Sequence, residues 1–126
     1  MLSCKARKMS LSNNKSGYVA EFLARCLLRL KGYRILAKNY VTGRGTNAGE
    51  LDIVALKGNT VIFIEVKKRR DLEEAAYAIS ENQKQRISRG AEAFLKHYLK
   101  YQNNDIRFDA ILVKLPLEIR HIKNAW

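Results

Sequence analysis

The stretch from Gly49 to Arg70 most constrains the fold, because it has the pattern of two β-strands joined by a tight turn. Both arms are rich in β-branched and aromatic residues, and the Gly58-Asn59 pair between them tolerates the positive φ that a short hairpin turn demands. Apolar residues occupy both faces of the second arm. The stretch therefore predicts a β-hairpin whose second arm is a central strand covered on both sides.

Charged side chains interrupt both of these apolar arms. Since side chains alternate between the faces of a strand, Glu50 and Asp52 are expected to share one face with Val54, and Glu65 is expected to share a face with Lys67. An unpaired charge in a covered sheet is costly, so something must compensate it. The plainer explanation is a cross-strand salt bridge from Asp52 or Glu50 to Lys67.

The alternative explanation for these charges is a divalent metal ion. Mg²⁺ and Mn²⁺ take hard oxygen ligands and need only one or two carboxylates, because water and substrate phosphate complete the coordination. Asp52 and Glu65 on adjacent strands suit such an ion. Lys67 emerges on the same face as Glu65, so its ammonium could hold an attacking water or neutralise charge developing on a phosphate.

The order Asp52, hairpin, Glu65-Val66-Lys67 resembles the Asp…Glu-x-Lys core of the PD-(D/E)XK phosphodiesterase superfamily, which includes restriction endonucleases and archaeal Holliday-junction resolvases. Five segments in order narrow the resemblance to the small bacterial YraN-like family of uncharacterised, nuclease-like proteins, from about Ser16 to about Val113. These segments are Ala20-Glu21, Gly49 to Ala55, Phe63 to Arg69, Lys84 to Ile87, and Arg107-Phe108-Asp109.

The resemblance implies a restriction-endonuclease-like sandwich and metal-dependent hydrolysis of phosphodiester bonds. DNA is expected as the substrate in preference to RNA. The expected cofactor is Mg²⁺ or Mn²⁺. The backbone carbonyl of Val66 would add a ligand, and Lys67 would orient or activate water. The expected metal ligands are Asp52, Glu65 and Glu50, and the expected catalytic residues are Asp52, Glu65, Lys67 and Glu21.

Glu21 has two interpretations. Ser16 as N-cap and Gly32 beyond the last turn bracket a predicted helix over residues 17–31. In that helix Glu21 lies four residues before Arg25, and an exposed ion pair there is worth only about 0.3–0.5 kcal/mol. The resemblance supplies the alternative, in which Glu21 reaches the metal site as an outer ligand or holds a water.

A second long helix is predicted over about residues 81–101, because Ser80 and Gln83 have the spacing of a capping box. A helix N-terminus attracts phosphate, although a solvated face explains the polar residues of its first turns nearly as well. Its predicted buried stripe is Ile87, Ala91, Phe94, Leu95 and Tyr98. The expected nucleic-acid contacts are Arg44, Lys68, Arg69, Gln83, Lys84 and Arg86. Arg44 lies in a Gly-rich loop. This loop could follow a phosphate backbone, but it could equally be a plain exposed hairpin loop.

The remaining segments complete an α/β sandwich on a central mixed sheet, in the order α-β-β-β-α-β with a further edge strand expected at the end. Strands are predicted over residues 33–40 and 106–115, and the edge strand over 117–122. Asp109 interrupts an apolar strand, and a structural pairing with Arg107 is favoured over a metal role. His121 has no companion that suggests zinc or general-base work.

Composition agrees with this interpretation. The 126 residues suit a single domain, expected over residues 17–126 and preceded by a disordered basic tail over 1–16. The 24 Lys and Arg against 12 Asp and Glu give a net charge of +12, which indicates a polyanionic partner. We expect a cytoplasmic protein that binds DNA, contacts no membrane and forms a homodimer if it cuts two strands. An inactive nucleic-acid-binding module and a basic scaffold protein remain open alternatives.

Overall fold

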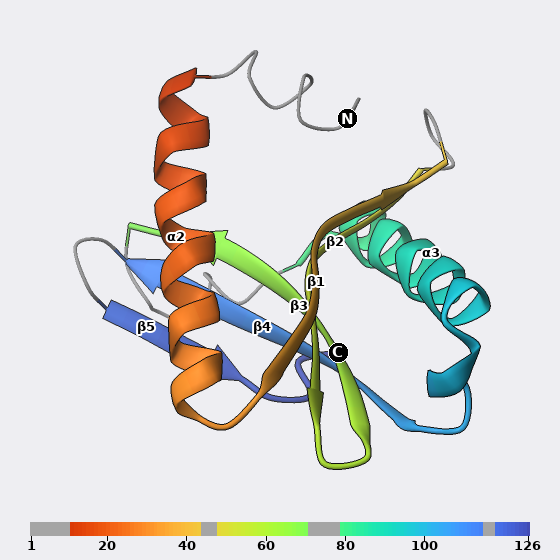
Figure 1. Cartoon of the computed structure of the whole chain (residues 1–126). Helices are drawn as coiled ribbons and strands as arrows, with labels where there is room; N and C mark the ends of the chain where they lie inside the picture. Colours follow the sequence, from red (N-terminus) through yellow and green to blue (C-terminus); the bar gives the residue numbers. More distant parts are fainter. Residues whose placement is uncertain (1–10, 44–47, 71–78, 115–117) are drawn as a thin grey trace.

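The structure is a computed structural model that describes residues 11–43, 48–70, 79–114 and 118–126; of residues 11–16 it describes the backbone alone. The described elements follow the predicted order α-β-β-β-α-β-β, which confirms the α/β class (Figure 1). They are α2 (Leu11–Leu30), β1 (Arg34–Thr42), β2 (Gly49–Lys57), β3 (Thr60–Lys68), α3 (Glu81–His97), the 3₁₀ turn η3 (Leu99–Tyr101), β4 (Asp105–Lys114) and β5 (Glu118–Ile122).

The five strands form one mixed sheet in the order β1-β2-β3-β4-β5. Only β3 and β4 run parallel, because the chain crosses over through α3 between them, and the other neighbours are antiparallel. The predicted hairpin is β2–β3. Lys57 pairs with Thr60 across a two-residue turn in which Gly58 has φ 58°.

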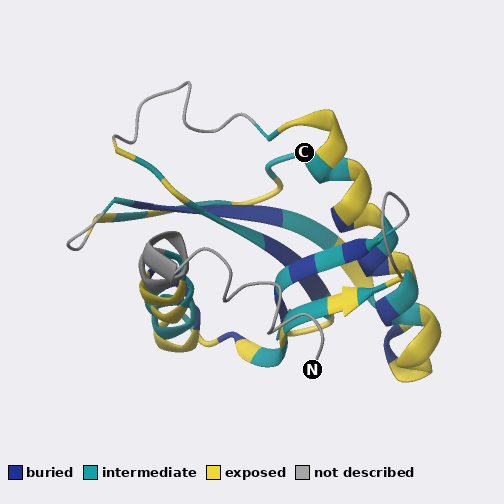
Figure 2. Ribbon diagram, turned by 90° about the horizontal axis from the view of Figure 1, so that it is seen from above, coloured by how far each residue is buried: buried dark blue, intermediate teal, exposed yellow. Residues whose placement is uncertain are grey.

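The two helices cover opposite faces of the sheet, so β2, β3 and β4 are buried on both sides (Figure 2). Under α2 the core contains Ala20, Ala24, Leu28, Tyr33, Ile53, Ala55, Ile62, Ile64, Ile111 and Val113. Under α3 it contains Leu51, Val54, Val61, Phe63, Ile87, Ala91, Phe94 and Tyr101. These two apolar layers explain why the second arm of the hairpin reads as apolar on both faces.

Both helices differ from their predicted bounds. The first begins at Leu11 and not near residue 17, so Ser16 lies inside it and is not its N-cap. The second begins as predicted, because the Ser80 hydroxyl accepts from the Gln83 N–H at 3.1 Å and the Gln83 side chain accepts from the Ser80 N–H at 3.3 Å. It ends at His97, and Tyr98 lies beyond it and is exposed, so Tyr98 does not belong to the buried stripe. Of the disordered basic tail expected over residues 1–16, residues 1–10 lie outside the described residues, and the backbone of residues 11–16 is helical and belongs to α2.

Asp109 is buried in β4, where it is 0% exposed. The Arg107 guanidinium donates to both of its oxygens at 2.8 Å, which confirms the predicted structural pairing. Two further partners were not predicted: His121 of β5 lies 2.7 Å from Asp109, and the Asn124 N–H donates to it at 2.9 Å. His121 is therefore not isolated. This cluster joins the end of the chain to the sheet.

Neither helix of the described chain is long and apolar enough to span a membrane.

Candidate functional site

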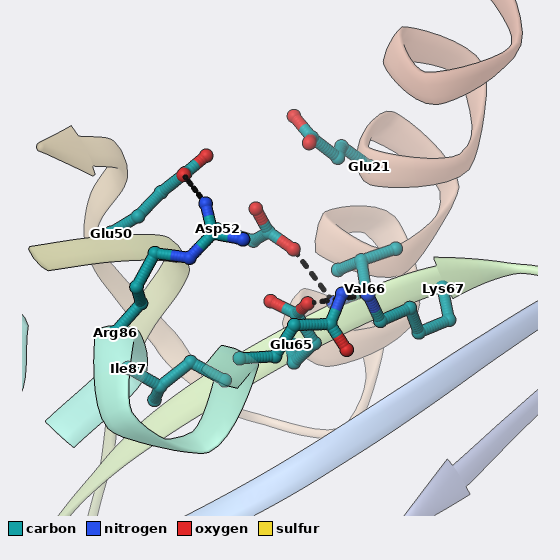
Figure 3. Close-up of a pocket in the computed structure, with 9 residues that line it drawn as sticks. Glu21, Glu50, Asp52, Glu65, Val66, Lys67, Arg86 and Ile87 are labelled. Atoms are coloured by element: carbon teal, nitrogen blue, oxygen red, sulfur yellow. Dashed lines mark hydrogen bonds and ion pairs between the residues drawn. The ribbon is translucent and has the colours of Figure 1, made fainter. Parts of the chain in front are cut away.

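The strands β2 and β3 separate at one end of their hairpin and form a fork. Their ladder runs from the turn to the Ile53–Ile64 pair, where it stops. Beyond that pair, the Asp52 carboxylate accepts a hydrogen bond from the Val66 N–H at 2.9 Å (Figure 3). In a continued ladder this N–H would bond to the backbone of β2, so the Asp52 side chain replaces backbone pairing at the fork.

The fork forms because the start of β2 packs onto α3. A Cβ atom added to Gly49 would lie 2.5 Å from the backbone nitrogen of Gly90, so only two glycines allow this approach. Leu51 is buried against α3 together with Val54. The strict alternation expected along this strand therefore fails at Asp52, which does not share a face with Val54 but reaches into the gap between the two strands.

A pocket of about 280 Å³ opens at this fork, between α2 and the first turns of α3 (Figure 3). The structure brings all four expected catalytic residues to its wall: Asp52 from β2, Glu65 and Lys67 from β3, and Glu21 from α2. Glu21 faces the pocket from the helix on the other side of the fork. The remaining lining residues are Glu50, Val66, Gln83, Arg86 and Ile87.

Burial and the neighbouring acidic groups raise the pKa of Asp52 well above its usual range. Burial is the largest cause, followed by the charge of Glu65, a hydrogen bond with the Glu65 carboxyl and the charge of Glu21. The hydrogen bond from Val66 opposes the shift. These causes favour the neutral form of Asp52, and either a bound proton or a cation would relieve the same repulsion.

The expected cross-strand salt bridge has a different partner. Lys67 Nζ lies 2.9 Å from Glu65 Oε2, on its own strand, and both side chains are largely buried, 14% and 12% exposed respectively. Glu50 pairs instead with Arg86 of α3 at 3.7 Å (Figure 3). Salt bridges thus account for the charges of Glu65, Lys67 and Glu50, but among the described residues they supply no cation to Asp52.

Four carboxylates line the pocket, and two of them, Asp52 and Glu65, lie within hydrogen-bond distance of each other. Within the described ranges, no three acid, imidazole or thiol side chains gather as a metal-holding group. Since the Glu50 carboxylate lies at Arg86, it does not complete a third position beside Asp52 and Glu65.

The expected nucleic-acid contacts divide into three places. Gln83 and Arg86 line the pocket, and Arg86 also lines a second cavity of about 360 Å³ with Asn82, Gln85 and Arg89. Lys84 is paired with Glu81 at 3.6 Å. Lys68 and Arg69 line a separate cavity of about 550 Å³ with Arg70 and Lys114. Arg44 lies outside the described residues.

Sequence reasoning missed two contributions to these sites. Arg89 extends the basic surface of α3 next to the pocket, and the spacing of Arg86 and Arg89 on one helix face was the available signal. Lys114 joins the basic cavity through the parallel pairing of β3 and β4, which no local pattern in the sequence reveals.

Comparison with known proteins identifies relatives across most of the chain. One is a UPF0102 protein, amb4503, of Paramagnetospirillum magneticum, 48% identical over 115 residues that cover 89% of this chain and 87% of that protein. A UPF0102 protein of a Bradyrhizobium species is 44% identical over 112 residues, 89% of this chain and 79% of its own length. A third, from Nitrobacter winogradskyi, is 40% identical over 111 residues, 88% of this chain and 91% of its own.

Residues 20–113 match the uncharacterised protein family UPF0102, which is the YraN family that the sequence resembles. The matched range includes every described residue of the predicted site, from Glu21 on α2 to Arg86 on α3. On this match and these relatives, the chain belongs to the uncharacterised protein family UPF0102.

Proposed function

We propose that this protein is a metal-dependent nuclease that hydrolyses phosphodiester bonds, with DNA as the preferred substrate over RNA. The observation that carries the proposal is the pair of carboxylates, Asp52 and Glu65, held at the fork with Lys67 beside them. The arrangement Asp52, hairpin, Glu65-x-Lys67 resembles the core of the PD-(D/E)XK superfamily. A structural salt-bridge cluster would not need a pocket open to solvent at these residues.

The residues present fit Mg²⁺ or Mn²⁺. Asp52 and Glu65 provide hard oxygen donors, and their mutual repulsion favours a cation between them. The Val66 carbonyl, on a residue that lines the same pocket, would join them as a ligand. When bound, the metal ion would act as a Lewis acid on a phosphate oxygen and lower the pKa of a water.

The chain's own groups would position the other reactants. The Lys67 ammonium, held by Glu65, would lie next to the scissile phosphate and offset the negative charge that develops there. Glu21, facing the pocket from α2, would accept a hydrogen bond from the attacking water. Gln83 and Arg86 would fix the phosphodiester from the N-terminal turns of α3.

One observation favours a second candidate, an inactive nucleic-acid-binding module. Lys67 already neutralises Glu65, and among the described residues no third acid, imidazole or thiol side chain joins Asp52 and Glu65 as a metal-holding group. In that case the basic residues of α3 would still bind phosphates, but the pocket would hold neither metal nor a reacting bond.

Metal binding and cleavage distinguish the two candidates. We expect Mn²⁺ to raise the melting temperature of the wild-type protein but not of Asp52→Ala, and we expect Mg²⁺ or Mn²⁺ to support cleavage of DNA. Asp105→Ala is the matched control, because Asp105 is exposed at the start of β4, away from the pocket. If Mn²⁺ shifts the melting temperature of wild type, Asp52→Ala and Asp105→Ala equally, and none of them cleaves duplex, branched or single-stranded DNA, the nuclease is rejected. The inactive binding module is then the function that remains.

A further inference from the structure

The outer face of α2 exposes two aromatic rings within one helical turn of Glu21. Tyr18 is 49% exposed and Phe22 is 54% exposed, whereas Ala20, Ala24 and Leu28 of the same helix are buried against the sheet. Large apolar side chains that remain exposed in a group usually mark a contact surface. We call Tyr18, Phe22 and the arginines Arg25 and Arg29 the aromatic face of α2.

This face borders Glu21, the residue of α2 that lines the pocket. Glu21 of α2 lines the pocket and points into it (Figure 3). Since each helical residue turns the chain by about 100°, Arg25 lies about 40° and Tyr18 about 60° from Glu21 around the helix axis. A chain of nucleotides that leaves the pocket past Glu21 would therefore meet Arg25 and Tyr18 first, and Phe22 next.

The positive charges of the aromatic face attract an anionic ligand and repel the same face of a second copy of this chain. The Arg25 guanidinium lies 6.0 Å from the centre of the Phe22 ring, and Arg29 is exposed one turn further along. A symmetric pair of α2 helices would gather the arginines of both copies in one interface, and the aromatic face as defined carries no acidic residue to pair with them. Phosphates would neutralise them, as the net charge of +12 also favours.

We propose that the aromatic face of α2 stacks unpaired bases, so that the substrate is single-stranded nucleic acid or a strand that leaves a duplex beside the scissile bond. This inference rests on the proposed nuclease function and names its substrate class. Every base has a π face, so Tyr18 and Phe22 bind without sequence preference. In an uninterrupted duplex the base faces are covered by their neighbours and these rings have nothing to stack on.

The test compares variants that keep a ring with variants that lose it. Binding of the full chain is measured by fluorescence anisotropy in chelator, with a labelled single strand, a flapped duplex and a blunt duplex of equal length. We expect Tyr18→Leu and Phe22→Leu each to weaken single-strand and flap binding by about 5-fold to 100-fold, and blunt-duplex binding by less than 2-fold. Tyr18→Phe should bind like wild type.

Leu30→Ala is the matched control, because Leu30 is 86% exposed on the same helix but lies beyond the aromatic residues. It should bind all three probes like wild type. A second measurement does not depend on the leucine variants folding: in Tyr18→Trp, the new indole fluorescence should be quenched by the single strand and not by the blunt duplex.

The outcomes separate this inference from the nuclease proposal. Binding that depends on the rings without any cleavage in Mg²⁺ or Mn²⁺ supports the inference and overturns the nuclease. Cleavage with unchanged affinity in both leucine variants overturns the inference alone. If Phe22→Leu changes the sedimentation of the free protein but not its single-strand affinity, the face is an interface between copies, and the inference is wrong. No binding of any probe at low salt overturns it as well.

Discussion

Gly49 and Gly90 lie in backbone contact, so that a Cβ atom on Gly49 would come within 2.5 Å of the Gly90 nitrogen and 2.8 Å of its Cα. This contact holds the start of β2 against α3 and keeps the fork open. The position of Asp52 therefore depends on two residues that carry no side chain. It is also the simplest feature to test by substitution.

We expect Gly49→Ala to lower the free energy of unfolding by about 1–3 kcal/mol, because the added methyl group must push β2 away from α3. Any cleavage activity should fall as well, since Asp52 moves with β2. Gly17→Ala is the control: its methyl group would meet nothing within 4 Å, and the change should stabilise α2 by roughly 0.5–1 kcal/mol. Urea unfolding measures both. Equal stability of the two variants would contradict the proposed contact.

Asp52→Asn should stabilise the metal-free protein at neutral pH. The charge of Asp52 is disfavoured by burial and by Glu65 and Glu21, so the neutral amide relieves repulsion and can still accept from Val66. We expect the melting temperature to rise by about 2–5 °C in chelator. A fall in melting temperature would mean that the Asp52 charge is already compensated in the folded chain.

Asp109 predicts a loss of stability in acid. Burial alone would raise its pKa, but hydrogen bonds from His121, Arg107 and the Asn124 backbone outweigh burial and lower the pKa of Asp109 to about 2 from the ordinary 3.8. A lowered pKa in the folded state stabilises the protein above pH 3.8, and this contribution is lost as the pH falls towards 2.

The measurement is the urea midpoint of wild type and Asp109→Asn over this range. The variant should be less stable at pH 6 by roughly 3–5 kcal/mol, because Arg107 and the buried His121 lose their anionic partner. The difference between the two proteins should shrink from about pH 4 to pH 2. A constant difference would show that the Asp109 charge is not what stabilises the cluster.

Lys67→Ala and Glu65→Ala should separate chemistry from binding. Lys67 is one of 24 basic residues, so its loss should change DNA affinity by less than about 3-fold while cleavage falls by orders of magnitude. Glu65→Ala should abolish metal-induced stabilisation and leave metal-free binding intact or slightly tighter, because an anion near the phosphate is removed. Lys38→Ala, at an exposed position of β1, is the control for a simple loss of charge. Gel shifts in chelator beside cleavage assays in Mg²⁺ measure both effects.

Nucleic-acid affinity should fall steeply with salt. If six phosphates are contacted by the basic residues of α3 and the neighbouring cavities, the affinity should drop about 1,000-fold between 50 and 200 mM salt. Arg86→Ala and Arg89→Ala should each reduce the slope of log affinity against log salt by about one. A slope near zero would show that the basic surface does not bind the nucleic acid.

The sequence was sufficient to predict the hairpin, the capping box and the order of elements, because each has a local cause. The Gly58-Asn59 turn sets the pairing of β2 with β3, and Ser80 with Gln83 begins α3. The meeting of Asp52, Glu65 and Lys67 follows from that hairpin together with the Asp…Glu-x-Lys spacing.

The parts that sequence could not predict all depend on contacts between distant segments. Strict alternation placed Asp52 beside Val54, but the Gly49–Gly90 contact holds the start of β2 against α3, and Leu51 is buried there together with Val54. No local pattern encodes this contact. His121 appeared isolated because Asp109, its partner, belongs to another strand. The start of α2 at Leu11 was missed because Ser16 is a good N-cap residue, and residues of that type also occur within helices.

The two-residue turn at Gly58-Asn59 also limits how this chain can vary over evolution. A hairpin loop accepts an extra residue without loss of the fold, but a shift of one residue in pairing turns every following side chain to the opposite face. Glu65 and Lys67 would then point towards α2 and away from Asp52. The length of a surface turn, usually the most permissive property of a protein, is therefore inherited here together with the chemistry at the other end of the hairpin.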